Sequence, residues 1–268
     1  MNSIEQAYDD TPQYEWDRLE RHRVEYGVTM RALADHLPPA PAKIADIGGS
    51  VGRYAIELTR QGYEVTLVDI AEKCLDFARH KADEAGVALA GIVKADARDL
   101  SALGDDTFDA VLLMGPLYHL LEHSHRLASI LEARRILREG GRVFATFISR
   151  FCMVQCAAAF RVPYICDFRD ELETILTTGV YRHSESSGTF PDAWFAHPDE
   201  ILPLMAEAAF RRVDMFSCEP LAYCLEEGIN KAPDDLHKQW IDLLYRLSRE
   251  PSLMGGGGHL LYVGTKSE

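Results

Sequence analysis

Residues 44–53 read IADIGGSVGR, and the other elements of the chain can be placed around this stretch. A short apolar run ends at Ile47 and leads directly into the glycine-rich turn 48–52. A helical pattern follows, for which Ser50 is the expected N-cap and Gly62 the expected stop. Glycines let the backbone approach a ligand closely and adopt angles that a side chain would forbid. A strand, a glycine turn and a helix in this order are typical of a nucleotide-binding α/β unit.

The spacing of the glycines bears on which nucleotide binds. A dinucleotide fingerprint is G-x-G-x-x-G, whereas Gly48, Ser50 and Gly52 stand two positions apart. An acid, Asp46, precedes the first of them by two positions. This pattern resembles the E/D-x-G-x-G-x-G motif of the class I S-adenosylmethionine (SAM) methyltransferases, with serine in place of the middle glycine. The resemblance implies that Asp46 and the turn orient the cofactor and take no direct part in the chemistry.

Two further acids stand at the ends of predicted strands. Residues 64–69 predict a second strand ending in Asp69, whose carboxylate can accept hydrogen bonds from both hydroxyls of a ribose. Dehydrogenases share this feature, so it does not discriminate between the two families. Residues 92–97 predict a third strand with a third acid, Asp96. The resemblance implies that Asp96 holds the adenine amino group and that the next backbone N–H, that of Ala97, meets the ring.

Two later segments extend the resemblance. Residues 108–114 predict a buried strand that enters the turn Gly-Pro-Leu-Tyr-His at 115–119. Residues 132–147, EARRILREGGRVFATF, resemble the family's next helix, ending at Gly140-Gly141, and its fifth strand. The motifs cover roughly residues 40 to 150 and are most similar to the ubiquinone/menaquinone-biosynthesis-like small-molecule methyltransferases. The resemblance implies SAM as cofactor, S-adenosylhomocysteine as product, and these cofactor-binding residues: Asp46, Gly48, Gly49, Ser50, Gly52, Asp69, Ile70, Asp96, Ala97, Met114 and Gly115.

The expected fold is α/β, with a seven-stranded, mostly parallel Rossmann-like sheet and an antiparallel last strand at 259–264. Residues 1–268 are expected to form a single methyltransferase domain. Within it, residues 1–40 predict an N-terminal helical cap, with one long helix over 13–37. The segments 150–198 and 219–256 are much longer than ordinary connections, and both are interpreted as lid insertions over the active site.

The bulk composition restricts the partners. A net charge of −14 without a basic block argues against a nucleic-acid substrate. Neither a signal peptide nor an apolar window of about 18 residues is visible, so we expect a cytoplasmic protein without a membrane partner. The six cysteines lack paired spacing, and no cysteine or histidine set has a zinc pattern, so no metal is expected. Nothing in the sequence indicates an oligomeric state.

His119 is the candidate general base, because a histidine can remove a hydroxyl or thiol proton near neutral pH. One alternative is that His119 packs structurally under the lid, and His197 and His259 are further alternatives for the base. Candidate contacts with the methyl acceptor are Tyr118 beside it, Tyr14 in the cap, Trp194 in the first lid and His259 at the last strand. The turn 115–118 lacks the Asn/Asp-Pro-Pro-Tyr motif of enzymes that methylate planar amines, which disfavours a nucleobase acceptor.

The leading functional hypothesis is SAM-dependent transfer of a methyl group to an O, N or S atom of a small apolar or aromatic molecule, with secondary metabolism as one setting. An NAD-dependent oxidoreductase is the first alternative, and the glycine spacing and the third acid oppose it. A non-catalytic SAM-binding regulatory module is the second. The lid-sized insertions oppose that reading, because a sensor has no need of an acceptor pocket.

Overall fold

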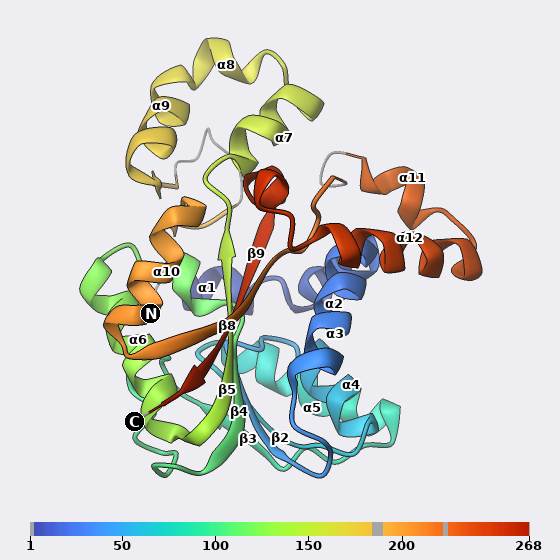
Figure 1. Cartoon of the computed structure of the whole chain (residues 1–268), viewed down its shortest axis with the longest axis vertical. Coiled ribbons are helices and arrows are strands. Elements are labelled where there is room, and N and C mark those ends of the chain that lie inside the picture. The colour runs from blue at the N-terminus through green and yellow to red at the C-terminus, as the bar shows by residue number, and fades with distance from the viewer. Residues whose placement is uncertain (1–2, 184–189, 222–224, 268) are drawn as a thin grey trace.

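The computed structural model describes residues 3–183, 190–221 and 225–267 and is built around a seven-stranded sheet (Figure 1). The strands lie in the order β3-β2-β1-β4-β5-β9-β8. Strands β1 to β5 run parallel, and β9 runs antiparallel to both β5 and β8. The predicted α/β fold is therefore confirmed. The strand bounds are β1 (Lys43–Ile47), β2 (Glu64–Asp69), β3 (Gly91–Lys94), β4 (Phe108–Leu113), β5 (Leu137–Ile148), β8 (Phe210–Ser217) and β9 (His259–Lys266).

Helices cover both faces of the sheet, and a short antiparallel ribbon lies outside it. The helix bounds are α1 (Ser3–Asp9), α2 (Pro12–Arg21), α3 (Arg23–His36), α4 (Arg53–Arg60), α5 (Glu72–Ala85), α6 (His123–Ile136), α7 (Cys152–Phe160), α8 (Tyr164–Asp167), α9 (Arg169–Thr178), α10 (Pro198–Glu207), α11 (Glu226–Asn230) and α12 (Asp234–Leu247). The 3₁₀ segments are η1 (Pro116–His119) and η2 (Pro251–Gly256), and the ribbon joins β6 (Val180–Tyr181) to β7 (Ala193–Trp194).

The central strands are apolar throughout because both of their faces are buried. In β4, Val111 and Leu113 pack on the face covered by α6 and α10. Ala110 and Leu112 point to the opposite face, which α3, α4, α5 and α12 cover. All four side chains are fully buried, and their alternation is the two-residue period of a strand. The layered core holds the carboxyl ends of the parallel strands at one edge of the sheet.

The N-terminal cap differs from its prediction. The single helix expected over 13–37 is two helices, α2 and α3, that are separated at His22. His22 has non-helical angles of φ −110° and ψ 57°, and its ring Nδ1 contacts the carboxylate of Glu226 in α11. Arg18 of α2 makes two hydrogen bonds to Glu25 of α3 across this break. The apolar period continues through the break, which is why the sequence pattern did not reveal it.

Two element boundaries also differ. The helix expected to end at Gly140-Gly141 ends at Ile136, because Leu137 already pairs with Phe108 of β4 and begins β5. The third strand ends at Lys94 instead of Ala97, because the chain turns there to place Asp96 at the sheet edge. The antiparallel direction predicted for the last strand is confirmed.

The two segments interpreted as lids have different surroundings. The first, 150–198, carries α7, α8 and α9, which project beyond the sheet at the top of Figure 1. The second, 219–256, carries α11 and α12, and α12 packs along α3, where Ile241 lies against Gly27. Among the described residues, no helix combines the length and the apolar character that a membrane span requires.

The turns after β1 and β4 touch backbone to backbone. A Cβ atom on Gly115 would lie 2.7 Å from the carbonyl oxygen of Gly48. A Cβ atom on Gly48 would lie 2.5 Å from Cδ of Pro116, and Gly48 also has a φ of +70°, which disfavours any other residue. Both turns therefore need glycine to come this close.

We predict that Gly115→Ala lowers the free energy of unfolding by about 1–3 kcal/mol, because the added methyl group overlaps the backbone of the neighbouring turn. Gly228→Ala in α11 is the matched control, since its Cβ would meet nothing within 4 Å. The measurement is urea unfolding of both variants. Equal stability of Gly115→Ala and the parent chain would show that the two turns can separate without cost.

Candidate active site

A cavity of about 530 Å³ lies where the parallel strands end. The turns after β1, β2, β3 and β4 form one part of its wall, and the N-terminal helices α1 and α2 form another. The first insertion contributes Arg182, Phe190 and Asp192. The described residues of 219–256 do not contribute to the wall. The structure therefore places the N-terminal cap and the first insertion over the cavity, and the second insertion behind α3.

Most of the predicted site residues come together in this wall. They are Tyr14, Asp46, Gly48, Gly49, Ser50, Asp69, Ile70, Asp96, Ala97, Met114, Gly115, Tyr118, His119 and His259. Gly52 and Trp194 lie outside it.

Gly52 and Ser50 have roles other than those expected. Gly52, with a φ of +75°, is the N-cap residue of α4, and its Cβ would lie 3.2 Å from that of Ala78 in α5. It lets α4 and α5 pack closely. The prediction that Ser50 is the N-cap is wrong, because α4 begins only at Arg53. Ser50 instead takes a left-handed φ of 49°, and its backbone N–H donates to the carboxylate of Asp69 at 2.8 Å.

Trp194 is buried in the main core and does not face the cavity. Its ring lies 6.4 Å from that of Phe147, and the guanidinium of Arg126 lies 3.8 Å from its centre. The pairing of β7 with β6 turns this side chain onto the sheet. Phe190, four positions earlier in the chain, lines the cavity in its place.

Asp46 is the most unusual acid in the wall. Only 1% of its surface is exposed, and neither carboxylate oxygen makes a hydrogen bond of ordinary geometry among the described residues, although the nearby backbone N–H of Ala55 partly opposes the rise of its pKa. Burial, reinforced by the neighbouring carboxylate of Asp69, raises the pKa of Asp46 to about 7. A buried carboxyl group without a donor costs free energy, which a cationic ligand in the cavity can recover.

Asp69 and Asp96 are already engaged by the protein. The two oxygens of Asp69 accept from the backbone N–H groups of Ser50 and Ala71, both at 2.8 Å. Burial nevertheless raises the pKa of Asp69. The carboxylate of Asp96 is bound by the guanidinium and the backbone N–H of Arg98, and its side-chain bond to Arg98 lowers the pKa of Asp96. A ligand that uses Asp96 must share this carboxylate with Arg98.

Both ring nitrogens of His119 are occupied. Nδ1 lies 3.1 Å from the carbonyl oxygen of Asp192, which can only accept, so Nδ1 carries the hydrogen. Nε2 is then an acceptor, and the hydroxyl of Tyr8 donates to it at 2.7 Å. Burial lowers the pKa of His119 to about 4. These contacts join the cap to the turn after β4, and they leave no free lone pair on the predicted base.

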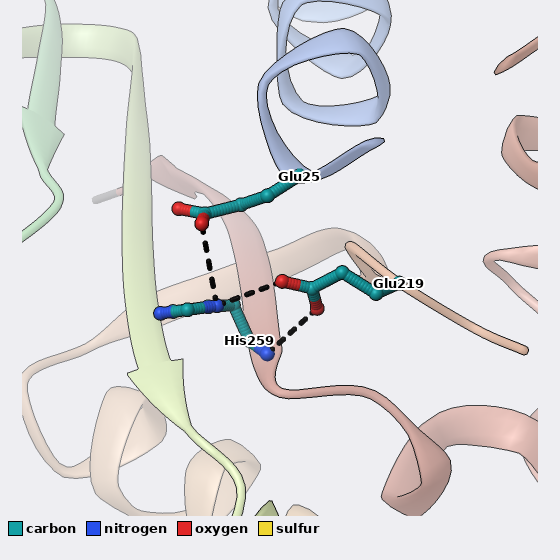
Figure 2. A group of neighbouring side chains, drawn as sticks. All are labelled: Glu25, Glu219 and His259. Carbon is teal, nitrogen blue, oxygen red and sulfur yellow. Dashed lines mark hydrogen bonds and ion pairs between the residues drawn. The ribbon is translucent and has the colours of Figure 1, made fainter. Parts of the chain in front are cut away.

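A cluster of three side chains, Glu25, Glu219 and His259, lies at the cavity wall (Figure 2). Of these, the sequence had indicated only His259. Nδ1 of His259 lies 2.8 Å from Oε1 of Glu219 and 3.7 Å from Oε2 of Glu25. Arg18 donates two hydrogen bonds to Glu25, at 2.7 Å to the same Oε2 and at 2.9 Å to Oε1. A signal for Glu219 was present, because it stands two residues after the end of β8 and so at the same sheet edge as the other acids.

Comparisons with known proteins agree with this geometry. Residues 44–141 match the model of a methyltransferase domain family. The ubiquinone biosynthesis O-methyltransferase of Xylella fastidiosa is 30% identical over 52% of this chain and 54% of its own length. Its counterpart from Xanthomonas axonopodis pv. citri is 30% identical over 58% of this chain and 61% of its own length. The chain thus spans little more than half the length of these curated relatives.

Solved structures show the same fold. A SAM-dependent methyltransferase from Methanosarcina mazei has a TM-score of 0.60 at 19% identity, covering 88% of this chain and 97% of its own. A possible histamine N-methyltransferase from Thermotoga maritima has a TM-score of 0.58 at 18% identity, covering 98% and 99%. The [4+2]-cyclase SpnF has a TM-score of 0.58 at 15% identity, covering 90% and 80%. Residues 44–141 are thus similar to a methyltransferase domain, and the chain has the fold of the SAM-dependent methyltransferases.

Proposed function

We propose that this chain transfers the methyl group of SAM to a hydroxyl oxygen of a small aromatic molecule. One observation carries the proposal: a single cavity joins the turns after β1 to β4 to an aromatic and ionisable region at the ends of β5 and β9. The curated relatives are named as O-methyltransferases, which favours oxygen over nitrogen or sulfur. The rings of Tyr8, Tyr118 and Phe190 favour a flat, largely apolar acceptor.

The wall of the cavity fits the cofactor. The unpartnered carboxyl group of Asp46 is suited to an ammonium group, such as that of the methionine part. A Cβ atom on Gly49 would lie 2.6 Å from Oδ2 of this carboxyl group, so the turn needs glycine at this position. Asp69 and the backbone of Ile70 would hold the ribose, and Asp96 and Ala97 the adenine. The backbone at Met114 and Gly115 follows β4 and lines the cavity beside Gly48.

When bound, the cofactor supplies a methyl group that is already activated on a sulfonium. The residues of this chain have to bind the acceptor, orient its oxygen toward that methyl group and exclude water, and such orientation can supply much of the rate. Tyr14 and Tyr118 remain proposed contacts of the acceptor, and Arg182 and Phe190 join them from the first insertion. Residues 1–40 and 150–198 are therefore the proposed lids, whereas the contacts of 219–256 favour a supporting role for that segment.

The contacts of His119 favour a role other than the general base predicted from the sequence. As a base it would have to release the hydroxyl of Tyr8 first, and its pKa of about 4 would keep it neutral but weakly basic. Its bonds to Tyr8 and Asp192 favour a positioning role, in which His119 joins the cap, the turn after β4 and the first insertion.

Other chemistry on this fold remains the competing hypothesis, and the cyclase among the structural neighbours is one instance by its own title. Calorimetric titration with SAM and with NAD separates a methyltransferase from an oxidoreductase. Incubation of the protein with SAM and a set of hydroxylated aromatic compounds, followed by mass spectrometry, tests transfer itself. Binding of SAM without a methylated product from any of them would favour a regulatory module.

We predict that Asp69→Ala weakens SAM binding by about 2–3 kcal/mol, because it removes charge-assisted hydrogen bonds to the ribose and the acceptor of the Ser50 backbone N–H. Asp99→Ala is the matched control, since Asp99 is exposed near the same sheet edge but does not line the cavity. Isothermal titration calorimetry measures both variants. Unchanged SAM affinity in Asp69→Ala would remove the ribose assignment.

We also predict a pH-dependent stability difference for Asp46→Asn without ligand. The folded-state pKa of Asp46 is about 7 and exceeds the unfolded value, so the carboxyl group progressively destabilises the fold as the pH rises from about 4 to about 7. Over this interval the free energy of unfolding of the parent chain should fall by about 3–4 kcal/mol relative to that of Asp46→Asn. Urea unfolding at several pH values measures the difference.

Asp83→Asn, an exposed change on α5, provides the control and should follow the parent chain at every pH. A difference in the free energy of unfolding between the parent chain and Asp46→Asn that stays constant from about pH 4 to about pH 7 would mean that Asp46 is ionised in the folded protein. In that case a donor to its carboxylate must exist.

A further inference from the structure

His259 occupies the part of the cavity that the cofactor residues leave free. The residues proposed to hold the cofactor follow β1, β2, β3 and β4, which are neighbours on one side of the sheet. The strands next in order are β5 and β9, where Ile148 and His259 pair with each other and both line the cavity. The acceptor therefore has its space at the end of β5 and the start of β9, where His259 offers a ring nitrogen that can accept a proton.

The ring of His259 is held from behind. Oε2 of Glu219 accepts from the backbone N–H of His259 at 2.9 Å, and Oε1 accepts from its Nδ1 at 2.8 Å. A carboxylate in this position keeps the hydrogen on Nδ1, so the lone pair of the neutral ring is on Nε2. Figure 2 shows Nδ1 beside the two carboxylates and the far end of the ring pointing away from both. Glu25 and Glu219 do not line the cavity, whereas His259 does.

The charges around His259 come from three elements and favour its protonated form. Glu219 follows β8, Glu25 lies on α3, and Arg18 on α2 neutralises part of the charge of Glu25. Burial alone would lower the pKa of His259, but the carboxylates of Glu25 and Glu219 outweigh burial and raise it. His259 is thus a stronger base than His119, whose pKa burial lowers to about 4.

We propose that Nε2 of His259 accepts the proton of the acceptor hydroxyl during methyl transfer, and that Glu219 is a positioning residue for its ring. This inference rests on the proposed function. The O–H bond of the acceptor breaks and its proton moves to Nε2. The oxygen forms its bond to the methyl carbon, while the electron pair of the breaking carbon–sulfur bond stays on sulfur. The imidazolium then returns the proton to solvent.

The contacts of the cluster do not suit a metal ion. The ligand atoms of Glu25, Glu219 and His259 lie within 4.8 Å of one another, which is compatible with a metal site in distance alone. Both oxygens of Glu25, however, accept from Arg18, and both oxygens of Glu219 accept from His259. The guanidinium of Arg18 balances one of the two carboxylates, and the ring of His259 balances the other whenever it is protonated, so no further cation is needed.

Nitrogen NMR of the whole 268-residue chain, labelled at its histidines, tests the geometry without turnover. The His259 signal is assigned by its loss in His259→Gln. We expect a pKa above about 6.5, the Nδ1–H tautomer at high pH, and a lower pKa in Glu219→Gln. An Nε2–H tautomer, a pKa unaffected by Glu219→Gln, or broadening of the signal by low concentrations of Mn²⁺ would overturn the proposal.

The rate of methyl transfer to catechol as a probe tests the chemistry. Because the neutral ring is the active form, kcat should fall as the pH drops through the pKa that NMR gives for His259. His259→Gln should lower kcat by about 10²–10⁴-fold, with SAM affinity nearly unchanged. The matched control is His123→Gln, an exposed histidine of α6 outside the cavity, which should retain the parent rate.

Glu219→Gln keeps an oxygen that can accept from the ring of His259. It therefore tests the proposal with a milder change, in case His259→Gln loses activity only because it fails to fold. Glu219→Gln should shift the kcat profile to lower pH together with the NMR pKa, which a purely structural role would not do. A parent enzyme that methylates catechol with a rate independent of pH between about 5 and 8, or a His259→Gln enzyme of near-parent kcat, would overturn the proposal. Absence of methylation by the parent enzyme would count against the proposed function, while the NMR result would still decide the state of His259.

Discussion

The close approach of two turns, at Gly48 and Gly115, is the constraint on which the cavity depends. Gly48 and Gly115 carry no side chains, so the backbones after β1 and β4 lie against each other and the ring of Pro116 packs on Gly48. A Cβ at either position would push these turns apart. Their contact forms a floor of bare backbone at the sheet edge. The side chains of Asp46 and Asp69 on one side, and of Tyr118 and His119 on the other, are arranged around that floor.

The two ends of the cavity differ in how they handle buried charge. At the cofactor end, the carboxyl group of Asp46 is buried without a partner, which is a cost carried by the ligand-free fold. At the other end, Glu25 and Glu219 are equally buried, but Arg18 and His259 satisfy them. The first arrangement is suited to binding a cation that arrives from outside. The second is suited to keeping a proton exchangeable at a fixed position, because the compensating charges are already in place.

The sequence predicted the fold, and most of the residues that it proposed for the cofactor line one cavity, because those signals are local. Asp69 and Asp96 each stand at or just after a predicted strand, and the carboxyl ends of parallel strands share one edge. The pair Tyr8 and His119 was not predictable, because 111 residues separate them and only the docking of α1 brings them together. The low pKa of His119 has the same origin, since burial depends on the tertiary packing of the cap.

Other differences between the prediction and the structure also have physical causes. Trp194 was placed in the acceptor site by its aromatic character, but the pairing of β7 with β6 directs its ring into the core. Ser50 looked like a helix cap because serine commonly is one, yet the turn continues to Gly52 before the helix begins. Glu219 could have been found by the strand-end rule that found Asp69. It was missed because β8 lies at the edge of the sheet, beyond the family motifs that guided the search.

The attachment of α1 has a consequence for the kinetics of ligand exchange. The bonds that join this short helix to the rest of the molecule include those of Tyr8 to His119 and Cys74, of Asp9 to the backbone N–H of Lys73, and of Glu5 to Lys94. Each buried bond has a net value of about 1 kcal/mol, whereas an exposed ion pair such as Glu5–Lys94 adds little, so the detached form is a minor population. The sheet can stay folded while α1 detaches. If exchange needs this opening, the measured association rate is the intrinsic rate scaled by that small fraction, and release of the product is slowed likewise.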